Sequence, residues 1–146
     1  MTPSLGDTLI EVDKVLDTGA LLAFYLAEPG GPKMEHYLSR IQSGSIKGYI
    51  NIVNLAELNY VLARKDFGVA EEKIDNLRLF GVEVVPVDNG PIWKKAAGGK
   101  AKGGLSFANA FAVATAIEKG GSLIVGDDSN FEGKGVPLIR IQKKSE

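Results

Sequence analysis

Short apolar runs alternate with longer segments of helical periodicity along most of this chain. Five runs, mostly rich in Val and Ile and bounded by Gly, Pro, Asn or Asp, predict strands over residues 12–16, 49–53, 82–87, 123–125 and 138–141. The segments between them predict helices over 19–27, 33–42, 55–65, 70–79, 91–98 and 107–119. Strands separated by helices require crossover connections, which make strands parallel. The pattern therefore predicts an α/β fold with a sheet covered on both faces.

The length of 146 residues fits a single domain, and 45% hydrophobic with 24% charged residues is a globular composition. We expect a lead-in over 1–11, one domain over 12–141 and a polar tail over 142–146. The N-terminus has no apolar signal core, and the longest uncharged apolar run, 103–117, is too short to span a bilayer. These features predict a cytoplasmic protein that does not associate with membranes.

The absence of cysteine excludes disulfides, thiolate zinc sites and a cysteine nucleophile. His36 is the only histidine, so a site with several histidine ligands is excluded, and a Ser/His/Asp triad would have to use that residue. Oxygen chemistry, based on carboxylate and amide side chains, is what remains for catalysis.

The net charge of −1 gives no overall sign of nucleic-acid binding. The only charged residues between Asp88 and Glu118, however, are four lysines, Lys94, Lys95, Lys100 and Lys102. This local excess of positive charge is the first place where a polyanion would bind. For any single lysine, a solvated helix face or loop is the simpler explanation.

Polar side chains are placed where the predicted strands end. Asp17 directly follows the first strand, and Asp127 and Asp128 directly follow the fourth. We expect Glu57 and Asn109 in or near the first turns of the helices over 55–65 and 107–119. The carboxyl ends of parallel strands meet at one edge of a sheet, which is where such folds bind ligands. The sequence therefore predicts an oxygen-rich site at that edge.

Each of these residues also has a purely structural explanation. Asp17 is a suitable helix cap, Asn54 and Glu57 form a capping-box pattern, and the segment 127–130 is typical of a turn. Asn109 lies in a stretch built for burial, where its amide would satisfy a hydrogen bond of the core. Four such coincidences at one sheet edge favour a site instead.

Clustered carboxylates repel one another unless a cation lies among them. Mg²⁺ and Mn²⁺ prefer carboxylate, amide and water oxygens, and Mg²⁺ commonly also binds substrate phosphates. A bound ion of this kind lowers the pKa of a water ligand and neutralises charge on a phosphoryl group. The site therefore predicts hydrolysis of a phosphate or phosphodiester without a protein nucleophile.

With these residues in view, the sequence resembles PIN-domain proteins of the kind found as VapC toxins in toxin–antitoxin pairs. Four segments carry the resemblance, which extends from residue 15 to about 141: VLDTGALLAFYL, LAELNYVLAR, LSFANAFAVATA and LIVGDDSNF. The resemblance implies a three-layer α/β/α sandwich with a central, mainly parallel sheet. It also implies a Mg²⁺- or Mn²⁺-dependent endoribonuclease that cleaves RNA, is covered by a cognate antitoxin and forms a homodimer.

In that family four acidic positions bind the metal, and the resemblance places them at Asp17, at Glu57, at Asn109 and at Asp127 or Asp128. The third position departs from the family, which has Asp there. An amide oxygen is a neutral ligand, so we expect this site to hold Mg²⁺ less tightly and activity to be weakened. Thr18 matches the hydroxyl residue that follows the first acid; it would either bind substrate or cap a helix. The four lysines would bind the RNA backbone.

Two other functions compete with this one. The first is a catalytically silent PIN-fold module that binds RNA or an antitoxin, with Asn109 as the inactivating change. The second is a phosphotransfer enzyme with Asp17 as phosphoacceptor. It is disfavoured because Gly19 occupies the position where haloacid-dehalogenase-type enzymes need a second Asp. Glycine-rich phosphate-binding motifs are also absent from the sequence.

Overall fold

The computed structural model describes residues 11–88 and 90–142. The predicted lead-in and tail, apart from residues 11 and 142, lie outside the described residues. The strands are β1 (Lys14–Leu16), β2 (Gly48–Asn51), β3 (Glu83–Val85), β4 (Ser122–Val125) and β5 (Leu138–Arg140). The helices are α2 (Thr18–Tyr25), α3 (Gly31–Gln42), α4 (Ile52–Ala63), α5 (Phe67–Leu79), α6 (Ile92–Ala101) and α7 (Phe107–Lys119), with a 3₁₀ turn, η1 (Ser129–Phe131).

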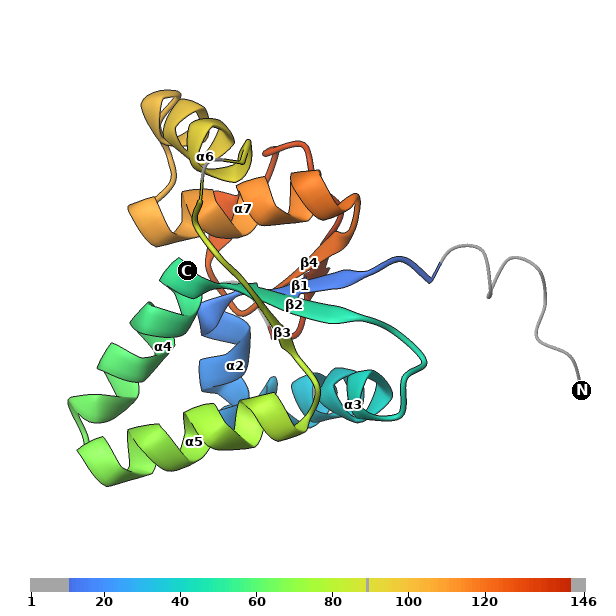
Figure 1. The fold of residues 1–146 in the computed structure, drawn as a ribbon, viewed down its shortest axis with the longest axis vertical. Coiled ribbons are helices and arrows are strands. Elements are labelled where there is room, and N and C mark those ends of the chain that lie inside the picture. Colours follow the sequence, from blue (N-terminus) through green and yellow to red (C-terminus); the bar gives the residue numbers. More distant parts are fainter. Residues whose placement is uncertain (1–10, 89, 143–146) are drawn as a thin grey trace, which may run out of the picture.

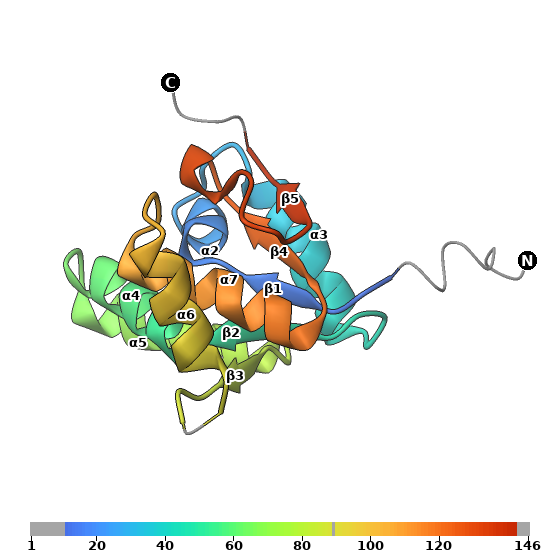
Figure 2. The ribbon, with the colours of Figure 1, turned by 90° about the horizontal axis from the view of Figure 1, so that it is seen from above.

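The five strands form one sheet in the order β3-β2-β1-β4-β5, and every neighbouring pair is parallel. Helices α2 to α5 lie on one side of the sheet and α6 and α7 on the other (Figure 1). The view from above shows α6 and α7 lying across the sheet (Figure 2). The predicted three-layer α/β/α sandwich is confirmed, and the sheet is wholly parallel.

Each face of the sheet has its own apolar core, because successive strand residues point to opposite faces. In β1, Leu16 joins the core under α2 to α5, whereas Val15 joins the core under α7. In β4, Ile124 and Leu123 divide in the same way. Burial on both faces explains why the strands appear in the sequence as short continuous apolar runs.

Helix α7 has the bounds that the sequence predicts. The hydroxyl of Ser106 accepts a hydrogen bond from the Asn109 N–H at 3.1 Å, which caps the helix N-terminus. The helix ends at Gly120, whose φ of 63° lies in the left-handed region that favours glycine. These two signals, one at each end, fix the helix and place Asn109 in its first turn.

The second strand and the helix after it differ from the prediction. β2 ends at Asn51 and α4 begins at Ile52, so Ile52 and Val53 are helical despite their β-branched side chains. The Asn51 side chain caps α4 by accepting from the Val53 N–H at 2.8 Å, and its amide donates to Thr115 Oγ1 of α7 at 3.0 Å. This tertiary anchor fixes the boundary. The predicted capping box of Asn54 and Glu57 is wrong, and Glu57 lies in the second turn of α4.

None of the helices in the described part of the chain has the length and apolar character that crossing a bilayer requires.

Candidate active site

Asp17 is a buried carboxylate at the carboxyl end of β1, with only 4% of its surface exposed. Its Oδ2 accepts a hydrogen bond from the Gly19 N–H at 3.0 Å, so it does cap α2, as its structural explanation predicts. Its Oδ1 is buried and has no hydrogen-bond partner among the described residues. Capping thus accounts for one oxygen of this carboxylate and leaves the other unexplained.

The electrostatic surroundings of Asp17 identify its acidic neighbours. Burial is the main cause that raises the pKa of Asp17 from 3.8 to about 7. The backbone N–H groups of Gly19 and Thr18 lower this pKa, whereas the negative charges of Glu57 and Asp128 raise it. Glu57 of α4 and Asp128 of the β4–η1 turn therefore lie close enough to Asp17 for their charges to act on it.

Two glycines allow the ends of β1 and β4 to approach closely. A Cβ atom on Gly126 would lie 3.0 Å from the carbonyl oxygen of Gly19, and a Cβ on Gly19 would lie 3.1 Å from Asp17 Oδ2. Side chains at these positions would push α2 away from the β4 end. The glycines thus help to place Asp17 beside the loop that carries Asp128.

Glu57 is half-buried on α4 and makes no hydrogen bond within the described residues. Because Asn51 caps the helix, Glu57 is not used for capping. From the second turn of α4 its negative charge acts on Asp17 and raises the Asp17 pKa. Helix capping, the structural explanation that the sequence offered for Glu57, is therefore excluded.

Asn109 is joined directly to Asp128. Its side-chain amide donates to Asp128 Oδ2 at 2.9 Å, while Asp128 Oδ1 accepts from the Asn130 N–H at 2.8 Å. Asn109 is 8% exposed, so this contact is partly shielded from water. An Asp at position 109 would place two carboxylates side by side, which repel one another unless a cation lies between them; the amide supplies a proton donor instead.

The sequence left open whether Asp127 or Asp128 belongs to the site. The structure places Asp128 against Asn109, and the Asp128 charge raises the Asp17 pKa, whereas Asp127 is exposed to solvent. Thr18 is buried, and its hydroxyl donates to the Asn54 carbonyl at 2.9 Å. In this position Thr18 ties α2 to α4.

Sequence reasoning missed Asn54 as a connector of the site. Its side-chain amide donates to the Ala108 carbonyl at 3.0 Å, and its own carbonyl accepts from Thr18. It is fully buried, and its Oδ1 has no partner among the described residues. Asn54 therefore links the segments that carry Asp17, Glu57 and Asn109. The pattern that drew attention to it, the apparent capping box, pointed to a different role.

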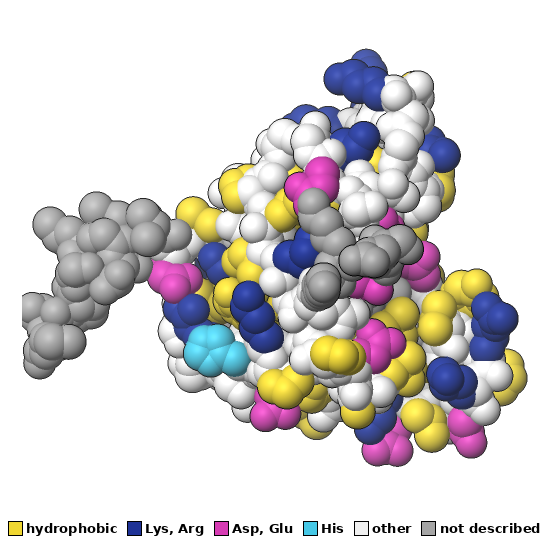
Figure 3. All heavy atoms as spheres, turned by 180° about the vertical axis from the view of Figure 1, so that it is seen from behind, with side chains coloured by type: hydrophobic (Ala, Val, Ile, Leu, Met, Phe, Trp, Pro, Cys, Tyr) yellow, Lys and Arg dark blue, Asp and Glu magenta, His cyan; other side chains and the backbone are white. Residues whose placement is uncertain are grey.

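The four predicted lysines lie on α6 or at its end, and Figure 3 shows Lys and Arg side chains at the top of the molecule, where α6 lies. Lys95 is bound to Glu118 of α7 at 2.6 Å. Glu118 is nine residues along α7 from Asn109, roughly 13 Å at the rise of an α-helix. Lys100 and Lys102 lie at the other end of α6. The lysines therefore do not form one uniform row.

The side chains near Asp17 offer oxygen ligands of the kind that Mg²⁺ and Mn²⁺ bind. Carboxylate and amide oxygens are suitable ligands, and the partnerless Oδ1 of Asp17 together with the negative charges of Glu57 and Asp128 near it fits a cation at this place. Within residues 11–88 and 90–142, however, no group of three His, Cys, Asp or Glu side chains is close enough to hold a metal ion. The residues fit the ion in chemistry, and Asn109 is the member that departs from an all-carboxylate set.

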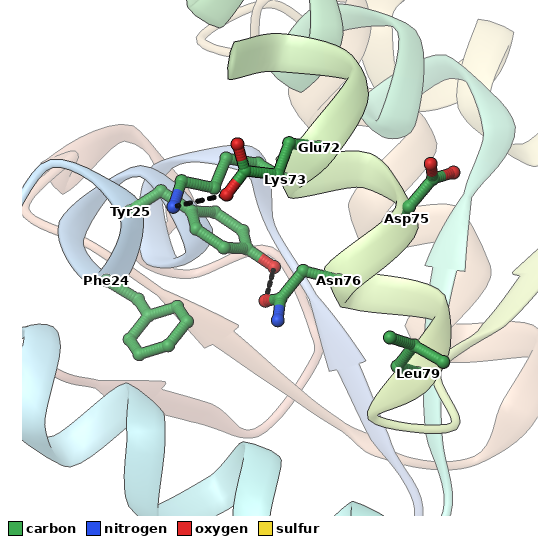
Figure 4. Close-up of a pocket in the computed structure, with 7 residues that line it drawn as sticks. All are labelled: Phe24, Tyr25, Glu72, Lys73, Asp75, Asn76 and Leu79. Atoms are coloured by element: carbon green, nitrogen blue, oxygen red, sulfur yellow. Dashed lines mark hydrogen bonds and ion pairs between the residues drawn. The ribbon is translucent and has the colours of Figure 1, made fainter. Parts of the chain in front are cut away.

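A separate cavity of about 460 Å³ lies between α2 and α5. Figure 4 shows Tyr25 of α2 extending toward α5, where its hydroxyl donates to Asn76 Oδ1 at 2.9 Å. Lys73 lies near the Tyr25 ring and pairs with Glu72 at 4.0 Å. None of the site residues predicted from sequence lines this cavity. It is a hollow between α2 and α5, and Asp17, Glu57 and Asp128 do not line it.

The chain belongs to the PIN domain family, whose model matches residues 14–136. No curated protein matches the sequence closely enough to be reported.

Solved structures with the same fold include toxin–antitoxin complexes. A chain of VapBC2 from Rickettsia felis, bound to a DNA fragment from its promoter, is 15% identical with a TM-score of 0.71 over 88% of this chain and 98% of that one. A chain of DNA-bound VapBC from Salmonella typhimurium is 14% identical with a TM-score of 0.71, covering 90% and 99%. A chain of FitAcB from Neisseria gonorrhoeae is 20% identical with a TM-score of 0.65, covering 88% and 97%. At these identities the likeness concerns the fold.

Proposed function

We propose that this PIN-domain chain is a metal-dependent endoribonuclease of toxin type, with a metal site weakened at Asn109. Membership of the PIN family supports a nuclease, and the VapBC and FitAcB neighbours support a toxin. The observation that carries the proposal is the state of Asp17. A fully desolvated carboxylate with a partnerless oxygen and two acidic neighbours is costly in a structural role, but it is the arrangement that a cation would stabilise.

In this proposal Asp17, Glu57 and Asp128 hold Mg²⁺ or Mn²⁺, and the amide oxygen of Asn109 is a neutral fourth donor. When bound, the ion activates a water molecule and neutralises charge on the phosphodiester. The hydrogen bond from the Gly19 N–H holds the buried Asp17 carboxylate in place at the bottom of the proposed site. Asn109 holds Asp128 in place through its amide hydrogen bond, which also reduces the negative charge that Asp128 offers.

The RNA substrate would approach over the positive surface of α6. Lys100 and Lys102 are the lysines at the end of α6 that leads to the first turn of α7, so we assign them the backbone contacts nearest the site. Lys94 and Lys95 would contact a longer RNA further from the reaction. Thr18 would contribute through the packing of α2 on α4.

We also propose a protein partner of antitoxin type and a homodimer. Complexes of toxin and antitoxin among the structural neighbours support the partner. Large apolar side chains exposed on α4 and α5, among them Tyr60, Phe67 and Leu79, offer surfaces for such contacts. Light scattering of the purified chain would measure its oligomeric state.

The test is cleavage of a fluorescently labelled single-stranded RNA with Mn²⁺ or Mg²⁺ and with EDTA. We expect metal-dependent cleavage by the unmodified chain. Asp17→Asn should reduce the rate at least about 1,000-fold, equivalent to about 4 kcal/mol of transition-state stabilisation. Asp66→Asn is the matched control, because Asp66 caps α5 through its side chain but lies outside the acidic cluster. Equal cleavage by the Asp17→Asn variant would contradict the proposal.

One observation favours the second candidate, a catalytically silent PIN module that binds RNA or an antitoxin. The Asn109 amide already compensates Asp128, and no three acids of the described chain are grouped for a metal. The two candidates differ in metal binding. The free Mn²⁺ signal in electron paramagnetic resonance should fall when the chain is added if it is a nuclease. It should be unchanged for the silent module, and Asn109→Asp should then restore neither metal binding nor cleavage.

A further inference from the structure

A second cavity, which we call the α6–α7 cavity, lies between α6, α7 and the loop over residues 133–135. Its volume of about 610 Å³ is larger than that of the cavity between α2 and α5. Asp17, Glu57 and Asp128 do not line it. The cavity therefore lies outside the acidic cluster, and it shares Lys95 and Lys102 with the surface proposed to bind RNA.

The floor of the α6–α7 cavity is aliphatic. Leu105, Val113 and Ile117 line it together with two alanines of α7. Ile117 is 44% exposed, although residues 111–116, which precede it on the same helix, are buried. An aliphatic floor with a solvent-exposed Ile is suited to branched apolar side chains of another molecule.

The rim of the cavity is positive. Lys95, Lys102 and Lys134 line it, and none of the described residues that line it is acidic. Lys95 is paired with Glu118, just outside the lining, while Lys134 donates to the backbone carbonyl of Gly103 at 3.3 Å. A carbonyl oxygen carries no full negative charge, so this hydrogen bond does not offset the positive charge of Lys134. The rim therefore complements carboxylates that flank apolar side chains.

The composition of the cavity favours a polypeptide over a nucleic acid. Proteins that bind single-stranded RNA combine positive charge with aromatic side chains on which bases stack. The described residues that line this cavity include no aromatic side chain. Aliphatic side chains from a helix or an extended segment match the floor better than planar bases do.

We propose that the α6–α7 cavity binds an acidic, aliphatic segment of a partner protein. The inference rests on the proposed function, in which a protein partner of antitoxin type binds the chain. One end of the cavity is lined by Ala110, in the same turn of α7 as Asn109. A segment seated in the cavity thus binds next to the turn that carries one residue of the site.

Gly98 allows the cavity to be filled without a clash. It lines the cavity within α6, and a Cβ atom there would meet no atom within 4 Å. Gly98→Phe should therefore occupy the cavity while α6 is retained, since glycine is the weaker helix former. Ala97→Phe is the matched control, because Ala97 is the preceding, exposed residue and does not line the cavity. Circular dichroism would check the fold of both variants, and Ile117→Lys provides a second way to alter the floor.

The probe is a phage library of random short peptides, selected on the unmodified chain and counter-selected on Gly98→Phe. We expect the selected peptides to be enriched in Asp or Glu together with Leu, Ile or Val. A synthetic peptide of the selected sequence should bind Gly98→Phe and Ile117→Lys at least about tenfold more weakly than the unmodified chain and Ala97→Phe. Lys134→Glu should weaken binding severalfold, by an amount that decreases as salt is added.

Selected peptides without acidic residues, or with equal affinity for Gly98→Phe, would overturn the proposal. It would also be overturned if Gly98→Phe weakened binding of a labelled RNA while peptide binding was unchanged. RNA cleavage by Gly98→Phe, which alters no residue of the acidic site, is measured in parallel. If cleavage is intact and no peptides are selected, only the docking surface is rejected. If peptides bind and no cleavage occurs with any metal, only the nuclease function is rejected.

Discussion

Asp17, after β1, and Asp128, in the turn after β4, are two aspartates in opposite surroundings. Asp17, after β1, is buried, has one oxygen without a partner among the described residues, and has a pKa raised to about 7. Asp128, after β4, is half-buried, and both of its oxygens accept hydrogen bonds. The difference comes from Asn109, whose amide serves Asp128 alone. Asp17 still requires a positive charge beside it, whereas for Asp128 the Asn109 amide already takes the place of that charge.

The most direct way to break this comparison is Asp17→Asn, which should have opposite effects on activity and stability. We expect the loss of cleavage described above, because the proposed function makes Asp17 a ligand of the metal. In EDTA the same variant should be more stable than the unmodified chain at neutral pH, because a buried charge is removed while a side-chain cap on Gly19 is retained. Chemical denaturation measures the second effect. A less stable Asp17→Asn variant would show that the Asp17 charge is satisfied within the protein alone.

The pH dependence of stability tests the same carboxylate without changing the site. The pKa of Asp17 is higher in the folded state, about 7, than its ordinary value of 3.8. Its stabilising contribution is therefore complete below about 3.8 and is lost as the pH rises through 7. The loss amounts to at most about 4 kcal/mol over that window.

The measurement is the free energy of unfolding in EDTA from pH 4 to pH 8 for the unmodified chain and for Asp17→Asn. The difference between the two isolates Asp17 from the other titrating groups, and we expect it to grow in favour of the variant as the pH rises. Excess Mn²⁺ should reverse this trend, since a bound cation lowers the pKa of Asp17. A difference that does not change with pH would contradict the raised pKa.

Gly126→Ala should disturb the close approach of the ends of β1 and β4. The new Cβ would lie 3.0 Å from the Gly19 carbonyl oxygen, and the backbone there cannot move without shifting α2. We expect a loss of about 1–3 kcal/mol in the free energy of unfolding and weaker Mn²⁺ binding. Gly98→Ala, the same substitution at an open helical position, should instead stabilise the chain by up to about 1 kcal/mol. If both variants behave alike, the close approach of the two glycines is not what positions the site.

Asn109→Asp would sharpen the comparison, because Asp128 would then, like Asp17, have a negatively charged neighbour. Without the amide donor, Asp128 faces a second carboxylate, so the metal-free chain should lose about 1–2 kcal/mol of stability. Mn²⁺ should bind about tenfold more tightly, because the site gains a negative charge, and cleavage should increase. Asn59→Asp, on the exposed surface of α4, is the control for added charge. Unchanged Mn²⁺ binding in Asn109→Asp would support the silent module.

The sequence was sufficient for the layers of this fold because each strand is buried on both faces and so appears as a short apolar run between helices. It was not sufficient at β2, where Ile52 and Val53 favour a strand by their own conformational preference. Asn51 overrides that preference through its cap and its hydrogen bond to Thr115, a residue 64 positions away. A contact between such distant residues leaves no local pattern in the sequence.

The positions of the site follow the same division. The chain order alone placed Asp17, Asn109 and the pair Asp127 and Asp128 at the carboxyl edge, because parallel strands all end there. Only the tertiary structure joined Asn109 to Asp128, exposed Asp127 to solvent, and left one oxygen of Asp17 without a partner among the described residues. Periodicity determines which edge of the sheet a residue occupies, whereas the direction of its side chain depends on packing between elements that the sequence keeps far apart.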